Sequence, residues 1–282
     1  MIKSIGVAGA GTMGSGIALS AALAGLPVVL FDTNKVVLEK ARNVINANLA
    51  YLIEKLKITP LQNEEALQKI FFTGDVLLCK GDIIIEAIIE DITAKRELFT
   101  QLDKVNDRDC IFASNTSSLS ITEIQNGIER PQRVAGMHFF NPAHIMKLVE
   151  VVKGKLTSDE TANTIIELAQ QLKKTAVLCI DAPGFIVNRV ARPYYLEAMK
   201  LVENGITSFE EADAVMEASG FKMGPFRLMD LIGIDINYAV STSLYNALEY
   251  PERLKPSKMQ SDKIEKGELG KKTGRGFYTY NK

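Results

Sequence analysis

The sequence has no excess of either charge, few cysteines and no long apolar run. Its 33 Lys and Arg residues balance 34 Asp and Glu residues, so it lacks the basic stripe that neutralises nucleic-acid phosphates. No window approaches the ~20 consecutive apolar residues of a membrane span, and the N-terminal MIKSIGVAGAGTMG lacks the apolar stretch of a signal peptide. We expect a cytoplasmic protein with neither a nucleic-acid nor a membrane partner.

The scarcity of cysteine and histidine limits the chemistry further. Cys79, Cys110 and Cys179 are odd in number, far apart and outside any metal-ligand spacing. We therefore expect reduced cysteines in a reducing compartment, and no metal site. The only histidines are His138 and His144, so any histidine-based catalysis depends on one of these two.

The first part of the chain alternates between two kinds of pattern. Up to about residue 180, short β-branched runs alternate with longer amphipathic stretches, which is typical of a parallel sheet wrapped by helices. Runs such as IIIEAI are apolar on successive residues, as expected for strands covered on both faces. We predict a Rossmann-like doubly wound α/β domain over residues 1–182. Within it, the long stretch 34–70, broken at Thr59-Pro60, indicates an inserted helical hairpin.

The pattern changes after the DAPG at 181–184. The stretches 184–204, 208–219 and 226–248 all have helical apolar spacing. We predict an all-helical C-terminal domain over residues 183–282.

A glycine-rich turn follows the first predicted strand. Gly9, Gly11 and Gly14 have the GxGxxG spacing between a strand and a helix. Gly9 allows the tight turn, Gly11 lets the backbone approach a pyrophosphate, and Gly14 permits close packing of helix on strand. Asp32 ends the second strand, 21 residues after Gly11, where a carboxylate binds the adenosine ribose hydroxyls. Because this carboxylate would repel a 2′-phosphate, we predict NAD rather than NADP as the cofactor.

An enzyme that transfers hydride from an alcohol also needs a group that moves the hydroxyl proton, and histidine is best suited to this near neutral pH. His138 ends the strand-like RVAGMHF, at a carboxyl end of the sheet, where doubly wound folds bind ligands. A histidine at a strand end is also often a hydrogen-bonded core residue. The residues alone leave both roles open.

Five strings spread over nearly the whole chain carry a further signal. They are SNTSSLSITEI (114–124), HFFNPAHIMKLVEVV (138–152), DAPGFIVNRV (181–190), GPFRLMDLIGID (224–235) and KKTGRGFY (271–278). In order and spacing they closely resemble the L-3-hydroxyacyl-CoA dehydrogenase family. The resemblance implies an NAD-dependent enzyme of the 3-hydroxybutyryl-CoA dehydrogenase type, which oxidises a short 3-hydroxyacyl-CoA at C3 or reduces the matching 3-ketone.

The resemblance also implies the catalytic residues. His138 matches the family's catalytic histidine, and Glu150 matches its carboxylate partner. The apolar neighbours of Glu150 favour a partly buried acid with a partner over a solvated carboxylate. Ser117 and Asn188 match residues that hold the reacting oxygen and the substrate, and Asn141 is a further substrate contact. Two structural alternatives stay open, because Ser117 could cap a helix starting near Ser120 and Asn188 could be a polar residue inside a helix.

The remaining ligand contacts are also implied by the resemblance. The residues expected near the cofactor are Glu90, Lys95, Asn115 and Lys272. CoA carries phosphates, and Lys55 and Lys57 of the inserted hairpin are candidates for binding them, although exposed lysines are more often solvated. The helical C-terminal region resembles the family's dimerisation domain, which implies a homodimer with an active-site cleft between the two domains.

Three alternatives to this function differ in what they require. The stretch 184–205 resembles relatives that handle 3-hydroxyadipyl-CoA in aromatic degradation, in which case Arg192 could face a distal carboxylate or could only face solvent. A two-domain dehydrogenase of free hydroxy acids would be expected to use a lysine for proton transfer. A non-catalytic NAD-binding structural or sensor protein would be expected to have a degraded dyad. The set of His138, Glu150 and Asn188 argues against the last two.

Overall fold

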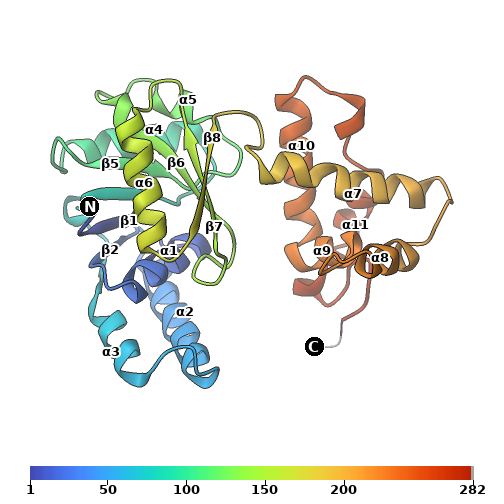
Figure 1. The fold of residues 1–282 in the computed structure, drawn as a ribbon, viewed down its shortest axis with the longest axis horizontal. Helices are drawn as coiled ribbons and strands as arrows, with labels where there is room; N and C mark the ends of the chain where they lie inside the picture. The colour runs from blue at the N-terminus through green and yellow to red at the C-terminus, as the bar shows by residue number, and fades with distance from the viewer. Residues whose placement is uncertain (281–282) are drawn as a thin grey trace. The chain divides into compact units, whose positions relative to one another are not determined.

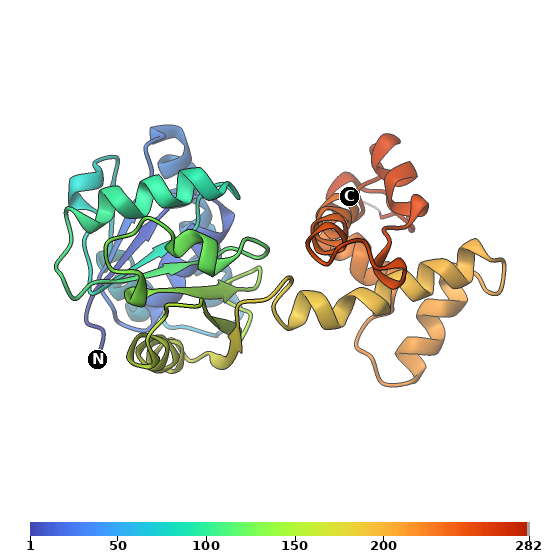
Figure 2. The same cartoon turned by 90° about the horizontal axis from the view of Figure 1, so that it is seen from above.

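The computed structural model describes residues 1–280, and its chain divides into two compact units, Met1–Ala182 and Pro183–Lys282. The first unit is built on a sheet and the second on helices (Figures 1 and 2). This arrangement confirms the predicted fold class, a doubly wound α/β part followed by a helical part.

An eight-stranded sheet forms the centre of the first unit (Figure 1). Its strands are β1 (Ile5–Ala8), β2 (Val28–Phe31), β3 (Ile70–Thr73), β4 (Ile83–Glu86), β5 (Ile111–Ser114), β6 (Val134–Phe139), β7 (Leu148–Lys153) and β8 (Thr175–Ile180). The strand order is β3-β2-β1-β4-β5-β6-β7-β8. All neighbours are parallel except β6 and β7, which pair antiparallel. The order reverses between β1 and β4, so the ligand-binding crevice of a doubly wound fold is expected beside these strands.

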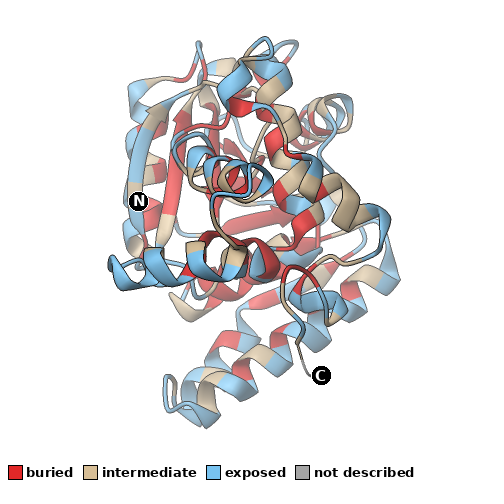
Figure 3. Cartoon of the chain, turned by 90° about the vertical axis from the view of Figure 1, so that its right-hand side faces the viewer, coloured by how far each residue is buried: buried red, intermediate tan, exposed pale blue. Residues whose placement is uncertain are grey.

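Helices cover both faces of this sheet. They are α1 (Thr12–Leu23), α2 (Lys35–Glu54), α3 (Pro60–Gln68), α4 (Ile92–Asp103), α5 (Ile121–Gln125) and α6 (Asp159–Gln171), with 3₁₀ turns at Val76–Leu78 and Pro131–Arg133. One core joins α1, α2 and α6 to inward side chains such as Met137 and Phe139. On the opposite face, Phe99 of α4 packs on Phe112 of β5. Figure 3 shows buried residues along the strands and exposed ones on the outer helix faces. Because both faces are covered, a central strand such as β4 is buried along its whole length.

The inserted segment forms the predicted helical hairpin, α2 and α3. Thr59 is the N-cap of α3, Pro60 its first residue, and Thr59 and Gln62 form a reciprocal capping box. Proline suits this position, because its missing N–H would have no helical partner there. The Thr59-Pro60 pair therefore starts the second helix of the hairpin.

The second unit consists of helices packed around a core of aliphatic and aromatic side chains. They are α7 (Val187–Glu203), α8 (Phe209–Ala218), α9 (Pro225–Ile232), α10 (Ile234–Ala247) and α11 (Lys258–Glu265), with 3₁₀ turns at Glu252–Leu254 and Lys271–Thr273. Phe226 packs edge-on against Phe277 near the C-terminal end of the described chain. Asp230 is buried and accepts the backbone N–H groups of Phe277 and Tyr278, which fixes that segment on α9. Within residues 1–280, no helix combines the length and the apolar character needed to cross a membrane.

Candidate active site

The three glycines of the first turn differ in why their positions need a glycine. Gly9 has φ +102°, and a Cβ there would lie 2.5 Å from the carbonyl oxygen of Ala87. A Cβ on Gly14 would lie 1.8 Å from the carbonyl oxygen of Gly9. Gly11 is exposed, and a Cβ there would meet no atom within 4 Å. Gly9 and Gly14 are therefore required by the fold, whereas Gly11 leaves open space where a ligand can approach the backbone.

The first turn of α1 is suited to an anionic ligand. Its N-cap is Gly11, which has no side chain that could cap the helix, and the first turn has no acidic residue. The first amides of a helix have no helical acceptor and carry partial positive charge. A helix start of this kind binds a diphosphate, so the residues present fit a dinucleotide cofactor.

Asp32 lies directly after β2 and is hydrogen-bonded to the glycine turn. Its Oδ2 accepts the N–H of Ala10 at 2.9 Å, and its Oδ1 accepts the N–H of Asn34 at 2.9 Å. Each carboxylate oxygen has a second lone pair for a further donor. The arrangement fits a carboxylate that binds ribose hydroxyls beside the glycine turn.

His138 and Glu150 lie opposite each other on neighbouring strands. They are direct partners in the antiparallel β6–β7 register, and Nδ1 of His138 lies 2.7 Å from Oε2 of Glu150. The two side chains are 7% and 1% exposed. Gly136, on the same side of β6 as His138, faces Ile121 of α5. The pair therefore lies on the face of the sheet that α5 covers.

The segment after β5 approaches the same strand end. Asn115 accepts the N–H of Phe139 through its Oδ1 at 2.8 Å, which links it to the residue beside His138. The backbone N–H of Ser117 donates to Oε1 of Glu90 at 3.0 Å. The N-cap of α5 is Ser120, whose hydroxyl oxygen accepts the N–H of Glu123. The capping alternative for Ser117 is thus wrong, because Ser120 fills that position.

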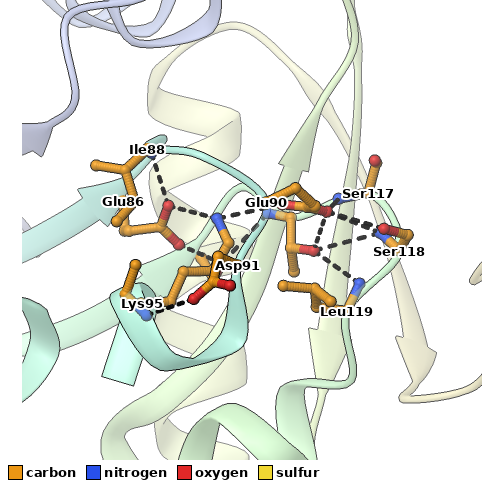
Figure 4. Close-up of polar contacts among 11 residues, drawn as sticks. Glu86, Ile88, Glu90, Asp91, Lys95, Ser117, Ser118 and Leu119 are labelled. Carbon is orange, nitrogen blue, oxygen red and sulfur yellow. Dashed lines mark hydrogen bonds and ion pairs between the residues drawn. The ribbon is translucent and has the colours of Figure 1, made fainter. Parts of the chain in front are cut away.

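Lys95 and Glu90 belong to a polar cluster, shown in Figure 4, that also contains Glu86. Nζ of Lys95 lies 2.6 Å from Oε1 of Glu86 and 3.2 Å from Oε2 of Glu90. Burial acts to raise the pKa of Glu90, but the Lys95 charge and the hydrogen bonds from Thr116 and Ser117 outweigh it and lower this pKa. Sequence reasoning missed Glu86. An acid directly after the apolar residues 83–85, within the run DIIIEAI, was the signal that could have found it.

The remaining predicted site residues lie apart from these clusters or in the second unit. Asn141 is exposed in the loop after β6, and Lys55 follows α2 and pairs with Glu54 at 3.2 Å. Asn188 lies in the first turn of α7. Lys272 contacts both carboxylate oxygens of Asp235 at 2.7 Å, so its ammonium is held within the second unit.

Arg192 does not have the solvent-facing position considered from the sequence. It is 4% exposed, and its guanidinium donates to the carbonyl oxygens of Asn188 and Asn237 and to Oγ of Ser241. Burial lowers its pKa to about 10. Arg192 therefore joins α7 to α10 and holds the backbone at Asn188.

Lys57 lies in a basic groove of the first unit. The groove has a volume of about 730 Å³ and is also lined by Lys69, His144, Lys147, Lys173 and Lys174, with Glu65 its one acidic lining residue. Among the residues that the structure describes, none of these five lysines lies within ion-pair distance of a carboxylate. Burial and the Lys174 charge lower the pKa of His144. The groove suits an anion.

Two family models match the chain. The 3-hydroxyacyl-CoA dehydrogenase NAD binding domain matches residues 4–182, and the 3-hydroxyacyl-CoA dehydrogenase C-terminal domain matches residues 184–280.

Relatives and solved structures agree with these models. The 3-hydroxyadipyl-CoA dehydrogenase of Escherichia coli K12 is 43% identical over 99% of this chain, which spans 59% of that relative's length. The probable 3-hydroxybutyryl-CoA dehydrogenase of Bacillus subtilis 168 is 43% identical, with 99% of this chain and 98% of the relative covered. The crystal structure of (S)-3-hydroxybutyryl-CoA dehydrogenase from Ralstonia eutropha has a TM-score of 0.94 at 38% identity, covering 100% of both chains. The resemblance predicted from the five strings is confirmed, and the chain belongs to the 3-hydroxyacyl-CoA dehydrogenase family of NAD-dependent oxidoreductases.

Proposed function

We propose that this protein is a 3-hydroxyacyl-CoA dehydrogenase of the 3-hydroxybutyryl-CoA type, which interconverts the 3-hydroxyl and 3-keto forms of its thioester substrate. The observation that carries the proposal is the buried His138–Glu150 pair at the carboxyl end of β6, in the same unit as the glycine turn and Asp32. The dyad is complete, which argues against a non-catalytic NAD-binding protein.

His138 is the proposed general base of oxidation. With the carboxylate of Glu150 at Nδ1, the neutral ring carries its proton on Nδ1 and has its basic lone pair on Nε2. The 3-hydroxyl proton passes to Nε2, and the carboxylate stabilises the resulting imidazolium. NAD⁺, when bound, supplies the hydride acceptor for C3. In reduction, His138 returns the proton to the oxygen.

The cofactor is proposed to bind along the carboxyl ends of β1, β2 and β4. The amides at the start of α1 would hold its diphosphate and Asp32 its adenosine ribose. Glu90, Lys95 and Asn115 are proposed for the nicotinamide half, where Lys95 uses two of its three N–H donors on Glu86 and Glu90. Lys272 is proposed as a further contact, in which case its ion pair with Asp235 orients it.

Three residues are proposed to bind the substrate. Ser117 and Asn188 would hold the C3 oxygen, and Asn141 would contact the thioester side of the substrate. The hydrogen bond from Ser117 N to Glu90 supports a fixed position for that loop, and the one from Arg192 to the carbonyl of Asn188 does the same for α7. Lys55 and Lys57 remain the proposed contacts of the CoA phosphates. Lys57 is supported by the other lysines of the groove, although the ammonium of Lys174 already donates to the carbonyl oxygens of Ala143 and Met146.

A dicarboxylic substrate, 3-hydroxyadipyl-CoA, is the second candidate. The Escherichia coli relative with that name favours it. The buried hydrogen bonds of Arg192 argue against this residue as the partner of a distal carboxylate. Initial rates with acetoacetyl-CoA, longer 3-ketoacyl-CoAs and 3-oxoadipyl-CoA, each with NADH, decide between the two substrates. A clear preference for 3-oxoadipyl-CoA would replace 3-hydroxybutyryl-CoA with 3-hydroxyadipyl-CoA as the proposed substrate.

A homodimer formed through the second unit and a cytoplasmic location are part of this proposal. The second unit exposes large apolar side chains, including Val190, Ile206, Val215 and Ile236, and such side chains are typical of protein interfaces. The three cysteines are free thiols, which suits a reducing compartment. Sedimentation velocity over a range of concentrations tests the dimer.

The decisive test of the proposed function is His138→Gln. Glutamine cannot accept the hydroxyl proton, so turnover of acetoacetyl-CoA with NADH is expected to fall about 100- to 10,000-fold. The dissociation constant for NADH should change little, since the residues proposed to bind the cofactor are untouched. Glu167→Gln, at an exposed position of α6 outside the proposed site, is the control and should keep its activity. Near-normal turnover of His138→Gln would remove the proposed role.

A further inference from the structure

Glu86 is a buried carboxylate that the chemistry above does not use. It ends β4, at the sheet edge where the cofactor is proposed to bind, and is 0% exposed. Oε1 accepts the backbone N–H of Ile88 at 2.7 Å and an N–H of Lys95 at 2.6 Å, and Oε2 accepts the hydroxyl of Ser114 at 2.6 Å. Three donors satisfy a carboxylate that water cannot reach, so this side chain has one fixed position.

Lys95 connects Glu86 to Glu90. Its side chain is 1% exposed, and its ammonium lies between the two carboxylates, with Glu90 at 3.2 Å (Figure 4). A lysine ammonium can turn freely about a flexible stem. The short, charge-assisted bond to Glu86 removes that freedom and sets the direction in which the remaining donors of Lys95 point.

Glu90 in turn holds the loop that contains Ser117. Its Oε1 accepts the Thr116 hydroxyl at 2.5 Å, the Ser117 N–H at 3.0 Å and the Ser118 hydroxyl at 3.0 Å. A second connection runs through Ser114, whose Oγ donates to Glu86 and accepts the N–H of Thr116 at 3.2 Å. Glu86 therefore reaches the loop by two independent chains of hydrogen bonds.

The charge of Glu86 also matters, because it is the buried counter-ion of Lys95. Burial raises the pKa of Glu86, and the charge of Lys95 opposes that shift. If Glu86 were neutral, the buried ammonium would have only Glu90, whose side chain is 37% exposed, as its counter-ion. A buried charge that loses one of its counter-ions moves toward the remaining counter-ion or toward water. The side chains of Lys95 and Glu90 would then both shift from their present positions.

We propose that Glu86 is a positioning residue for the nicotinamide half of the cofactor site, which acts through Lys95, Glu90 and the Ser114–Ser118 segment. This inference rests on the proposed function. Glu86 is too deeply buried to contact a ligand itself. Among the described residues, no hydrogen bond joins Glu86, Lys95 or Glu90 to Asp32 or the glycine turn, so the proposed binding of the adenosine half should not depend on this network.

The test is to compare NADH with ADP-ribose, which lacks the nicotinamide, as ligands of the Glu86→Gln protein. Glutamine keeps the size and one acceptor of glutamate but removes the charge that orients Lys95. The dissociation constant for NADH is expected to rise about tenfold or more, because hydrogen bonds to charged groups are lost. The dissociation constant for ADP-ribose should stay within about twofold.

Asp82→Asn provides the matched control. Asp82 precedes the first residue of β4 and accepts the N–H groups of Lys3 and Ser4, at 2.6 and 3.0 Å. Its replacement changes an acid at the opposite end of the same strand, so both ligands should bind as in the wild type even if the melting temperature falls.

The two ligands distinguish a positioning role of Glu86 from a general effect on folding. Equal weakening of NADH and ADP-ribose in Glu86→Gln, or no weakening of either, overturns the positioning role. If Glu86→Gln does not fold, Ser114→Ala, which removes one of the two connections, decides between the same outcomes. A wild-type protein that fails to bind NADH would instead contradict the proposed function, independently of Glu86.

Discussion

His138 and Glu150 are direct cross-strand partners of β6 and β7, with Nδ1 and Oε2 2.7 Å apart. Opposite residues of an antiparallel pair have their Cβ atoms about 5 Å apart, so the sheet itself sets the separation of the dyad. The orientation of the histidine therefore depends on strand register more than on loop conformation.

The role of Glu150 is tested by Glu150→Gln. The amide oxygen can still accept the Nδ1 proton, but it cannot stabilise an imidazolium, so kcat should fall about 100-fold or more. Steady-state rates with acetoacetyl-CoA and NADH measure the loss. Glu167→Gln, at an exposed position of α6, is the control and should not change kcat. A kcat for Glu150→Gln within about twofold of wild type would contradict the dyad.

Asp32 is expected to determine the preference for NADH over NADPH. Asp32→Ala removes the carboxylate that accepts the N–H of Ala10 and that is proposed to repel a 2′-phosphate. The ratio of kcat/KM for NADH to that for NADPH should fall at least about tenfold, the effect of removing a like charge a few ångströms away. An unchanged ratio would show that another residue selects the cofactor.

Alanine at Gly14 should lower the stability of the fold, whereas alanine at Gly11 should weaken NADH binding. A Cβ at Gly14 would lie 1.8 Å from the Gly9 carbonyl oxygen, so Gly14→Ala should unfold at a clearly lower temperature, in line with an overpacking cost of about 1–3 kcal/mol or more. Gly11→Ala meets no neighbour within 4 Å, so it should fold normally but bind NADH more weakly. Thermal melts and NADH titrations of both variants distinguish the two roles, and equal melting temperatures would refute the assignment.

The lysines of the groove are tested by the double substitution Lys57→Ala with Lys147→Ala. Both residues line the groove, and neither has a carboxylate within ion-pair distance among residues 1–280. If the CoA phosphates bind there, KM for acetoacetyl-CoA should rise about tenfold at low salt and less at high salt, because salt screens exposed charges. KM for acetoacetyl-N-acetylcysteamine, which has no phosphates, should not change. A parallel rise for both substrates would exclude phosphate binding at the groove.

The cysteines should resist alkylation in the native protein. Burial raises the pKa of the Cys79 and Cys110 thiols to about 12 and that of Cys179 to about 11. Since only the thiolate reacts and the raised pKa keeps these groups protonated, iodoacetamide at pH 8 should label the folded protein slowly and the denatured protein at all three positions. Mass spectrometry of intact protein counts the labels. Rapid labelling of the native protein at Cys79 or Cys110 would contradict this burial.

Local sequence was sufficient for the cofactor turn and the hairpin. The spacing of Gly9, Gly11 and Gly14 follows from short-range sterics between a strand and the next helix, and Thr59-Pro60 signals a helix start through its own backbone chemistry. Such features depend on neighbours in the chain, which is why the pattern of residues predicts them.

The sequence by itself determined the alternation of strands and helices, the glycine turn after β1 and, through family resemblance, the residues proposed for the site. Only the tertiary structure decided that His138 faces Glu150 in one register, that Ser120 rather than Ser117 caps α5, that Arg192 is buried, and that Glu86 joins Lys95 to Glu90. The physical reason is that these contacts join segments far apart in the chain. Their partners are chosen by sheet order and by the need to satisfy buried polar groups, which no local pattern encodes.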